Sequence, residues 1–126
     1  MIKDLIIENI KIESGKTETL FVKRNISGKI LKIAYRISPE AISKPKLQIF
    51  TREGEEILGV DETGVYYPRA NISSQKMQTN AVGYLGDKFD YFYFTKGLLF
   101  KVVKNSPVDE DVIIDKIIVV YEDGSR

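Results

Sequence analysis

Hydrophobic and polar residues alternate over short stretches along most of this chain. The clearest stretch spans residues 29–37, where one face carries Leu31, Ile33, Tyr35 and Ile37 and the other carries Lys32, Ala34 and Arg36. A period of two predicts a strand with one buried and one solvated face, because successive side chains of a strand point to opposite sides. Further stretches predict strands at residues 2–13, 17–24, 46–52, 56–60, near 75–82 and at 112–121.

The densest aromatic stretch lies between residues 89 and 104, where two strand-like runs flank Thr95-Lys96-Gly97. Aromatic and β-branched residues favour strands, and a Gly in a three-residue connection suits the positive φ of a bulged turn. We therefore predict a β-hairpin across this stretch.

Turn residues separate the predicted strands at intervals of roughly 8 to 12 residues, which is typical of a sandwich or barrel and not of a βαβ sheet. We expect an all-β fold: an antiparallel β-sandwich of the jelly-roll kind, with eight or nine strands. At most one short helical turn is expected, where Ser38 and Pro39 resemble a helix start. A chain of 126 residues is expected to form one core, so we predict a single domain over residues 1–122 and a polar tail at 123–126.

Composition excludes several kinds of chemistry. The chain has no Cys and no His, which removes disulfides, thiolate nucleophiles, the Ser-His-Asp arrangement and imidazole metal ligands. Its 19 Lys and Arg and 18 Asp and Glu are mixed along the length and give a net charge of +1, so the concentrated basic surface of a nucleic-acid-binding domain is not expected. No glycine motif for nucleotide phosphates occurs, and we expect no cofactor.

Charges interrupt the apolar N-terminal residues, so we expect no signal peptide and no membrane span.

Two groups of carboxylates remain as candidates for catalysis or metal binding. The first comprises Glu53, Glu55, Glu56, Asp61 and Glu62, and the second comprises Asp109, Glu110 and Asp111. A glycosidase needs two carboxyls that face each other, one of them in an apolar pocket, whereas both groups lie in predicted turns where charge is solvated. The second group also lacks the ligand spacing of an EF-hand loop. We therefore expect neither catalytic nor metal-binding residues, and no enzyme.

The candidate interaction residues are mostly aromatic. They are Tyr66, Tyr67, Arg69, Tyr84, Phe89, Tyr91 and Tyr93. Along one strand, Phe89, Tyr91 and Tyr93 would share a face and Phe92 and Phe94 the other. A core on one side buries only one of these sets, so the other is expected to meet a partner subunit, a ligand or a covering loop. The alternation alone does not say which set points outward.

The order of features from Val65 to Tyr121 resembles a known kind of protein. It consists of Tyr-Tyr-Pro-Arg, a polar stretch with Gln75 and Gln78, a Gly-containing turn, an aromatic strand, a Gly turn, an apolar strand and a last strand ending in Val-Tyr-Glu. This order is similar to that of small β-rich virion structural proteins of tailed bacterial or archaeal viruses, such as capsid decoration or head-associated proteins. The resemblance implies a non-enzymatic oligomer, often a trimer, whose aromatic surfaces pack between copies or onto a capsid.

Two hypotheses of different classes follow. The first is a virion component that self-associates and binds a capsid or other virion protein, with the virion as its location, or otherwise the cytoplasm. The second is a carbohydrate-binding module in which Tyr66, Tyr67 and Tyr84 form a stacking strip for a glycan.

Overall fold

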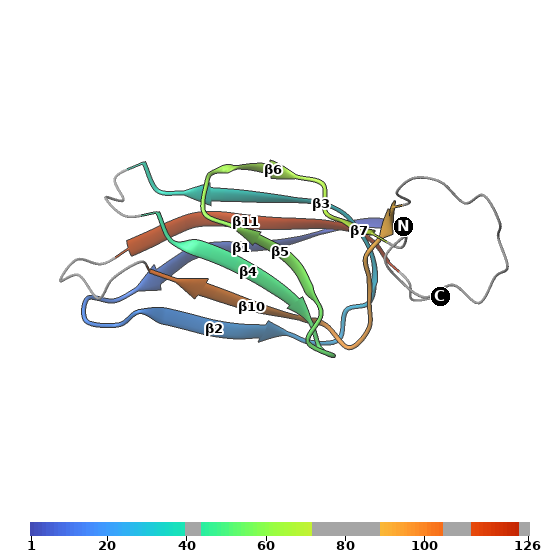
Figure 1. The fold of residues 1–126 in the computed structure, drawn as a ribbon, viewed down its shortest axis with the longest axis horizontal. Coiled ribbons are helices and arrows are strands. Elements are labelled where there is room, and N and C mark those ends of the chain that lie inside the picture. Colours follow the sequence, from blue (N-terminus) through green and yellow to red (C-terminus); the bar gives the residue numbers. More distant parts are fainter. Residues whose placement is uncertain (40–43, 72–88, 105–111, 124–126) are drawn as a thin grey trace, which may run out of the picture.

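The computed structural model describes residues 1–39, 44–71, 89–104 and 112–123 (Figure 1). In these residues the chain forms eleven strands and no helix, which confirms the all-β class. In chain order the strands are β1 (Ile2–Ile12), β2 (Glu18–Lys23), β3 (Gly28–Ile37), β4 (Lys46–Thr51), β5 (Glu56–Val60), β6 (Gly64–Tyr66), β7 (Arg69–Asn71), β8 (Phe89–Tyr91), β9 (Tyr93–Phe94), β10 (Leu98–Val103) and β11 (Val112–Asp123). The predicted eight or nine strands were too few, because β6 to β9 are only two or three residues long and leave little periodic signal.

Two antiparallel sheets make up most of the molecule. The first sheet has the order β1-β11-β3-β6, and β9 pairs with β3 as well. The second sheet has the order β2-β10-β4-β5, while β7 and β8 form a separate pair. Figure 1 shows β3, β11 and β1 on one side and β5, β4, β10 and β2 on the other. The chain therefore changes sheet between β1 and β2, and again between β2 and β3.

Both sheets supply side chains to one hydrophobic core. The rings of Phe21 on β2 and Phe100 on β10 stack with centroids 5.0 Å apart. Burial contributes about 1.5–3 kcal/mol for each large apolar side chain, so the shared core is the main attraction between the sheets. Its largest fully buried members include Ile12, Ile30, Ile33, Tyr35 and Ile117 from the first sheet and Leu47, Ile49, Leu98 and Phe100 from the second.

The buried face of β3 differs from the prediction at one position. Ile33 and Tyr35 point into the core as expected, but Ile30 is fully buried where Leu31 was predicted to be, and Leu31 is only half-buried. The register between β3 and β11 shifts at Val120 and Tyr121, which marks a β-bulge. A bulge adds a residue on one strand, so the alternation changes phase there.

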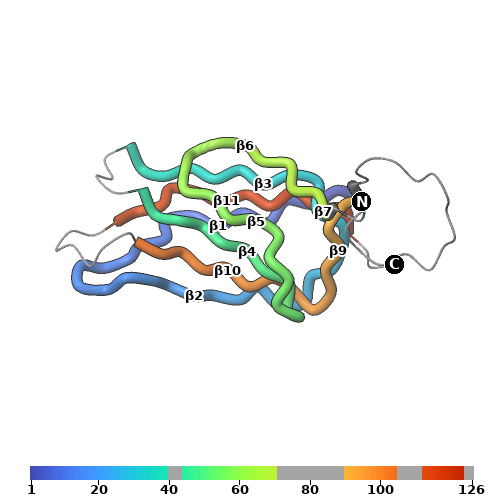
Figure 2. The backbone as a smooth tube through the Cα atoms, in the orientation of Figure 1, coloured from blue at the N-terminus to red at the C-terminus, as the bar shows by residue number. Residues whose placement is uncertain are grey.

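The predicted hairpin across residues 89–104 was wrong. β9 pairs with β3 in the first sheet, whereas β10 lies between β2 and β4 in the second sheet. Residues Thr95 to Gly97 therefore carry the chain from one sheet to the other, as Figure 2 shows where β9 leads into β10. Phe94 and Leu98, on either side of this crossing, are both buried in the same core.

Gly97 makes this crossing possible. Its φ is +97°, in the left-handed region, and a Cβ placed on it would lie 1.9 Å from the carbonyl oxygen of Lys23. Its amide N–H donates to the carbonyl oxygen of Ile26 at 2.8 Å. The turn is thus held against the connection between β2 and β3 and not against its own flanking strands.

Some predicted features lie outside the described residues. These are the strand near residues 75–82 and residues 40–43 of the predicted helical turn. At the C-terminus, Asp123 belongs to β11 although we placed it in the polar tail, and its carboxylate pairs with Lys3 at 2.7 Å.

Two buried polar side chains are satisfied by backbone carbonyls. The hydroxyl of Tyr35 donates to the carbonyl oxygen of Pro45 at 2.7 Å, which ties β3 to the start of β4. The ammonium of Lys104, just after β10, donates to the carbonyl oxygen of Glu13 at 2.8 Å and so ties the end of β10 to the turn after β1. Such bonds remove the cost of burying polar groups.

Gly97→Ala is expected to lower the free energy of unfolding by about 3 kcal/mol or more, because it combines left-handed strain with a backbone clash. Gly15→Ala is the matched control: Gly15 also has a positive φ, +81°, but a Cβ there meets no atom within 4 Å. That control should cost only about 1 kcal/mol. Urea unfolding of both variants measures the difference, and equal losses would show that the contact with Lys23 is unimportant.

Alkaline pH is expected to destabilise the protein through Tyr35. Burial, followed by the charges of Asp61 and Tyr66, raises the pKa of its hydroxyl above the usual value of about 10. The folded state therefore holds this proton more tightly, and the stabilisation is complete below about pH 10 and is lost as the pH rises further.

Tyr35→Phe should lower the free energy of unfolding by about 1 kcal/mol at neutral pH, because it removes the hydrogen bond to Pro45. Between about pH 9 and pH 11 the variant should then lose less stability than the wild type, because it lacks the hydroxyl that titrates. Thermal unfolding followed across this range is the measurement. Tyr67→Phe, at an exposed position, is the control. Parallel pH curves for wild type and Tyr35→Phe would contradict this assignment.

Candidate interaction surface

Five of the predicted interaction residues, Tyr66, Tyr67, Arg69, Tyr91 and Tyr93, belong to segments that lie along one edge of β3. β6 pairs with residues 33–35 of that strand, and β9 pairs with Gly28 and Lys29 further along the same edge. Between these two pairings, the guanidinium of Arg69 donates to the carbonyl oxygen of Leu31 at 3.2 Å. Segments 64–71 and 89–94, which are far apart in the sequence, therefore form one continuous margin of the first sheet. We call it the β3 margin.

Two cations lie over the ring of Tyr91 on this margin. The guanidinium carbon of Arg69 is 4.1 Å from the ring centroid of Tyr91, and the ammonium of Lys29 is 4.6 Å from it. Lys29 also pairs with Glu122 at 3.1 Å, and this bond raises the pKa of the lysine although burial opposes it. Such cation–π contacts favour a fixed ring position, so Tyr91 helps to hold the segments of the β3 margin together.

The structure shows which aromatic set points outward. Phe94 is buried and meets the ring of Tyr121 edge-on, with centroids 5.6 Å apart, and Phe92 packs against the core. Tyr93, between them, is 59% exposed. The outward set therefore includes Tyr91 and Tyr93, while the side chain of Phe89 lies outside the described residues.

Tyr66 and Tyr67 differ in exposure and do not form one strip. Tyr66 packs against the core, and its hydroxyl donates to the carbonyl oxygen of Glu62. Burial, followed by the charges of Glu62 and Asp61, raises the pKa of Tyr66. Tyr67 is 63% exposed. Tyr84, the third member of the predicted stacking strip, lies outside the described residues.

An apolar row that sequence reasoning missed crosses the outer face of the first sheet. The register places Ile6 opposite Ile118, Ile118 opposite Ala34, and Ala34 opposite Val65. The two ends of the row, Ile6 and Val65, are 51% and 54% exposed. A hollow of about 350 Å³ lies over its β3–β6 half. Each strand contributes one outward apolar residue, and only the pairing of four strands makes them contiguous.

Charged residues border this apolar row. On one side the register aligns Glu8, Lys116 and Arg36, and Lys116 pairs with Glu8 at 4.0 Å. On the other side Asp4 and Lys32 flank Val120. An apolar strip with polar borders is the pattern expected of a contact surface.

The outer face of the second sheet also carries apolar side chains. Leu99 on β10 lies opposite Val22 on β2 and Phe50 on β4, and Leu20 lies two residues further along β2. All four are at least partly exposed. The described part of the chain thus leaves apolar residues uncovered on both sheets.

The first group of candidate carboxylates does not converge. Glu53, Glu55 and Glu56 lie at the start of β5, and Asp61 and Glu62 follow its end, so the strand separates them. The second group, at residues 109–111, lies outside the described residues. Among the described residues, no three His, Cys, Asp or Glu side chains are grouped so that they could hold a metal ion. The same residues contain no helix long and apolar enough to cross a membrane.

A scan against protein-family models and a search of curated proteins found no match to this chain.

Arg69→Ala is expected to lower the free energy of unfolding by about 1–2 kcal/mol, because it removes the contact with Tyr91 and the bonds to the carbonyl oxygens of Leu31 and Pro68. Arg36→Ala is the matched control, since that arginine is exposed and has one long ion pair, 3.8 Å from Asp115. It should change stability by less than about 0.5 kcal/mol. Chemical unfolding measures both, and similar values would show that Arg69 does not stabilise the β3 margin.

Proposed function

We propose that this protein is a non-enzymatic structural component of a virion-type particle, which works by self-association and by binding a repetitive protein lattice. The observation that carries the proposal is the uncovered apolar row on the first sheet, from Ile6 to Val65. Monomeric soluble proteins rarely expose large contiguous apolar patches, and those that do often use them as contact sites.

The proposal includes a jelly-roll arrangement of the two sheets. The strand order supports it, because the two halves of the chain pair in reverse order: β1 with β11, β2 with β10, β3 with β6, and β4 with β5. This is the order expected when one long antiparallel ribbon folds over itself into two sheets. Jelly rolls are frequent among capsid proteins and also among lectins, so this strand order is compatible with the proposed function.

Edge exposure supports self-association. β1 forms one edge of the first sheet, and its outward Ile2 and Ile6 are both mostly exposed. Uncovered edges and apolar side chains favour association with another chain, and a closed ring of copies would cover both. Tyr67 and Tyr93 continue the exposed surface along the β3 margin, where aromatic side chains would add contact area.

The carbohydrate-binding alternative has less support. A stacking strip needs several aromatic rings on one exposed surface, but Tyr66 packs against the core while its neighbour Tyr67 is exposed. Tyr93 is a further exposed ring, but no described hollow places it beside Tyr67.

The test is the mass of the protein in solution at tens of micromolar, measured by size exclusion with light scattering. We expect a closed oligomer, with three copies as the first expectation. The double variant Ile6→Lys/Val65→Lys should shift the mass toward one copy, because it places charge at both ends of the apolar row. Both positions are about half exposed, so the fold should tolerate lysine there.

Leu20→Lys is the control, because Leu20 is equally exposed but lies on the second sheet. It should leave the oligomer intact. A wild-type monomer would contradict self-association, and equal dissociation by the control would show that the apolar row is not the contact.

A further inference from the structure

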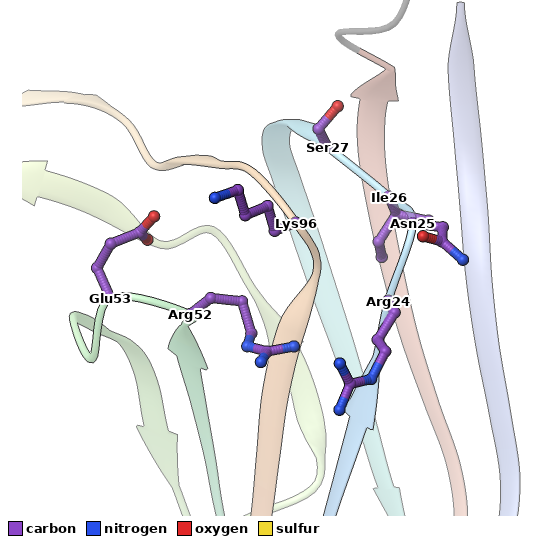
Figure 3. Close-up of a pocket in the computed structure, with 7 residues that line it drawn as sticks. All are labelled: Arg24, Asn25, Ile26, Ser27, Arg52, Glu53 and Lys96. Carbon is purple, nitrogen blue, oxygen red and sulfur yellow. The ribbon is translucent and has the colours of Figure 1, made fainter.

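A hollow of about 700 Å³ lies at one end of the molecule, where three connections meet (Figure 3). They are the connection between β2 and β3, the turn between β4 and β5, and the crossing before β10. We call this hollow the end pocket. Its lining residues are Arg24, Asn25, Ile26, Ser27, Arg52, Glu53 and Lys96.

The register of the second sheet places two arginines on either side of Gly97. Leu98 pairs with Lys23 on β2 and with Thr51 on β4, so the next residues outward are Arg24, Gly97 and Arg52. Two strand spacings separate the backbones of the arginines by roughly 10 Å, with Gly97 between them. Figure 3 shows the two guanidinium groups directed toward one another across β10.

The end pocket has a local excess of positive charge. Its described lining includes three cationic side chains, Arg24, Arg52 and Lys96, and one carboxylate, Glu53, which accepts a hydrogen bond from the hydroxyl of Thr95 at 3.5 Å. Within the described residues, neither arginine forms an ion pair. Two like charges that share a hollow repel each other, and an anion between them would relieve that repulsion.

Backbone hydrogen bonds hold the walls of the pocket in place. The amide of Gly97 donates to Ile26 at 2.8 Å, joining the crossing to the β2–β3 connection. On the other wall, Thr51 and Glu55 close the β4–β5 turn, with the amide of Thr51 donating to the carbonyl oxygen of Glu55 at 2.8 Å. The arginines therefore start from fixed backbone positions, which lowers the entropy cost of binding.

We propose that the end pocket binds an acidic peptide segment of a partner protein, with Arg24 and Arg52 each taking a carboxylate. The planar guanidinium group matches a carboxylate through two parallel hydrogen bonds. A polyphosphate chain fits less well, because the overall charge of +1 provides no basic surface beyond the pocket for further phosphates. This site is separate from the apolar row and does not depend on the proposed virion role.

The experiment measures the fluorescence anisotropy of a labelled oligo-aspartate peptide at low salt. The wild type should bind it, and Arg24→Gln/Arg52→Gln should weaken binding about tenfold, as expected for two exposed charged contacts. The matched control is Lys32→Gln/Arg36→Gln, which removes the same charge from the outer face of the first sheet and should retain wild-type affinity. Thermal unfolding confirms that each variant is folded.

Three results would overturn the proposal. They are no binding by the wild type, equal weakening by the control variant, and tighter binding of a labelled oligothymidylate of the same charge than of the peptide. Arg24→Lys/Arg52→Lys adds a positive test of the paired hydrogen bonds. It keeps both charges, so affinity between that of the Gln variant and the wild type supports carboxylate recognition by the guanidinium groups.

Discussion

The close approach of Gly97 to the carbonyl group of Lys23 is the constraint on which the rest of the structure depends. At this point the chain leaves the first sheet and enters the second, and the space excludes even a Cβ atom. The crossing lets Phe94 and Leu98 enter one core from different sheets. Because the two sheets are held together by that core, the backbone contact at Gly97 and the hydrophobic packing stabilise each other.

The same crossing determines what reaches the surface. With Phe94 fixed in the core, alternation sends Tyr93 outward, and Gly97 lies between Arg24 and Arg52 where the chain enters the second sheet. The exposed ring on the β3 margin and the paired arginines of the end pocket are therefore consequences of one local arrangement.

Much of the fold could be predicted from alternation, but the pairing of strands could not. Strands β3 and β4 follow stretches with a period of two, since a strand with one buried face imposes that pattern, whereas β11 follows a nearly continuous apolar run. The sequence around Lys96 and Gly97, both with positive φ, suits a hairpin and a crossing equally well. The hydrogen bond from Gly97 to Ile26 decides between them, and a contact across some seventy residues leaves no local signal.

The candidate surfaces show the same division between local and non-local information. Alternation correctly separated Tyr93 from Phe92 and Phe94, but which set is buried depends on β9 joining β3. The apolar row and the paired arginines are assembled from strands far apart in sequence, so their members look like isolated surface residues until the register is known. Net charge is a sum over the whole chain, so a balanced value of +1 leaves room for a local cluster of positive charge such as the end pocket.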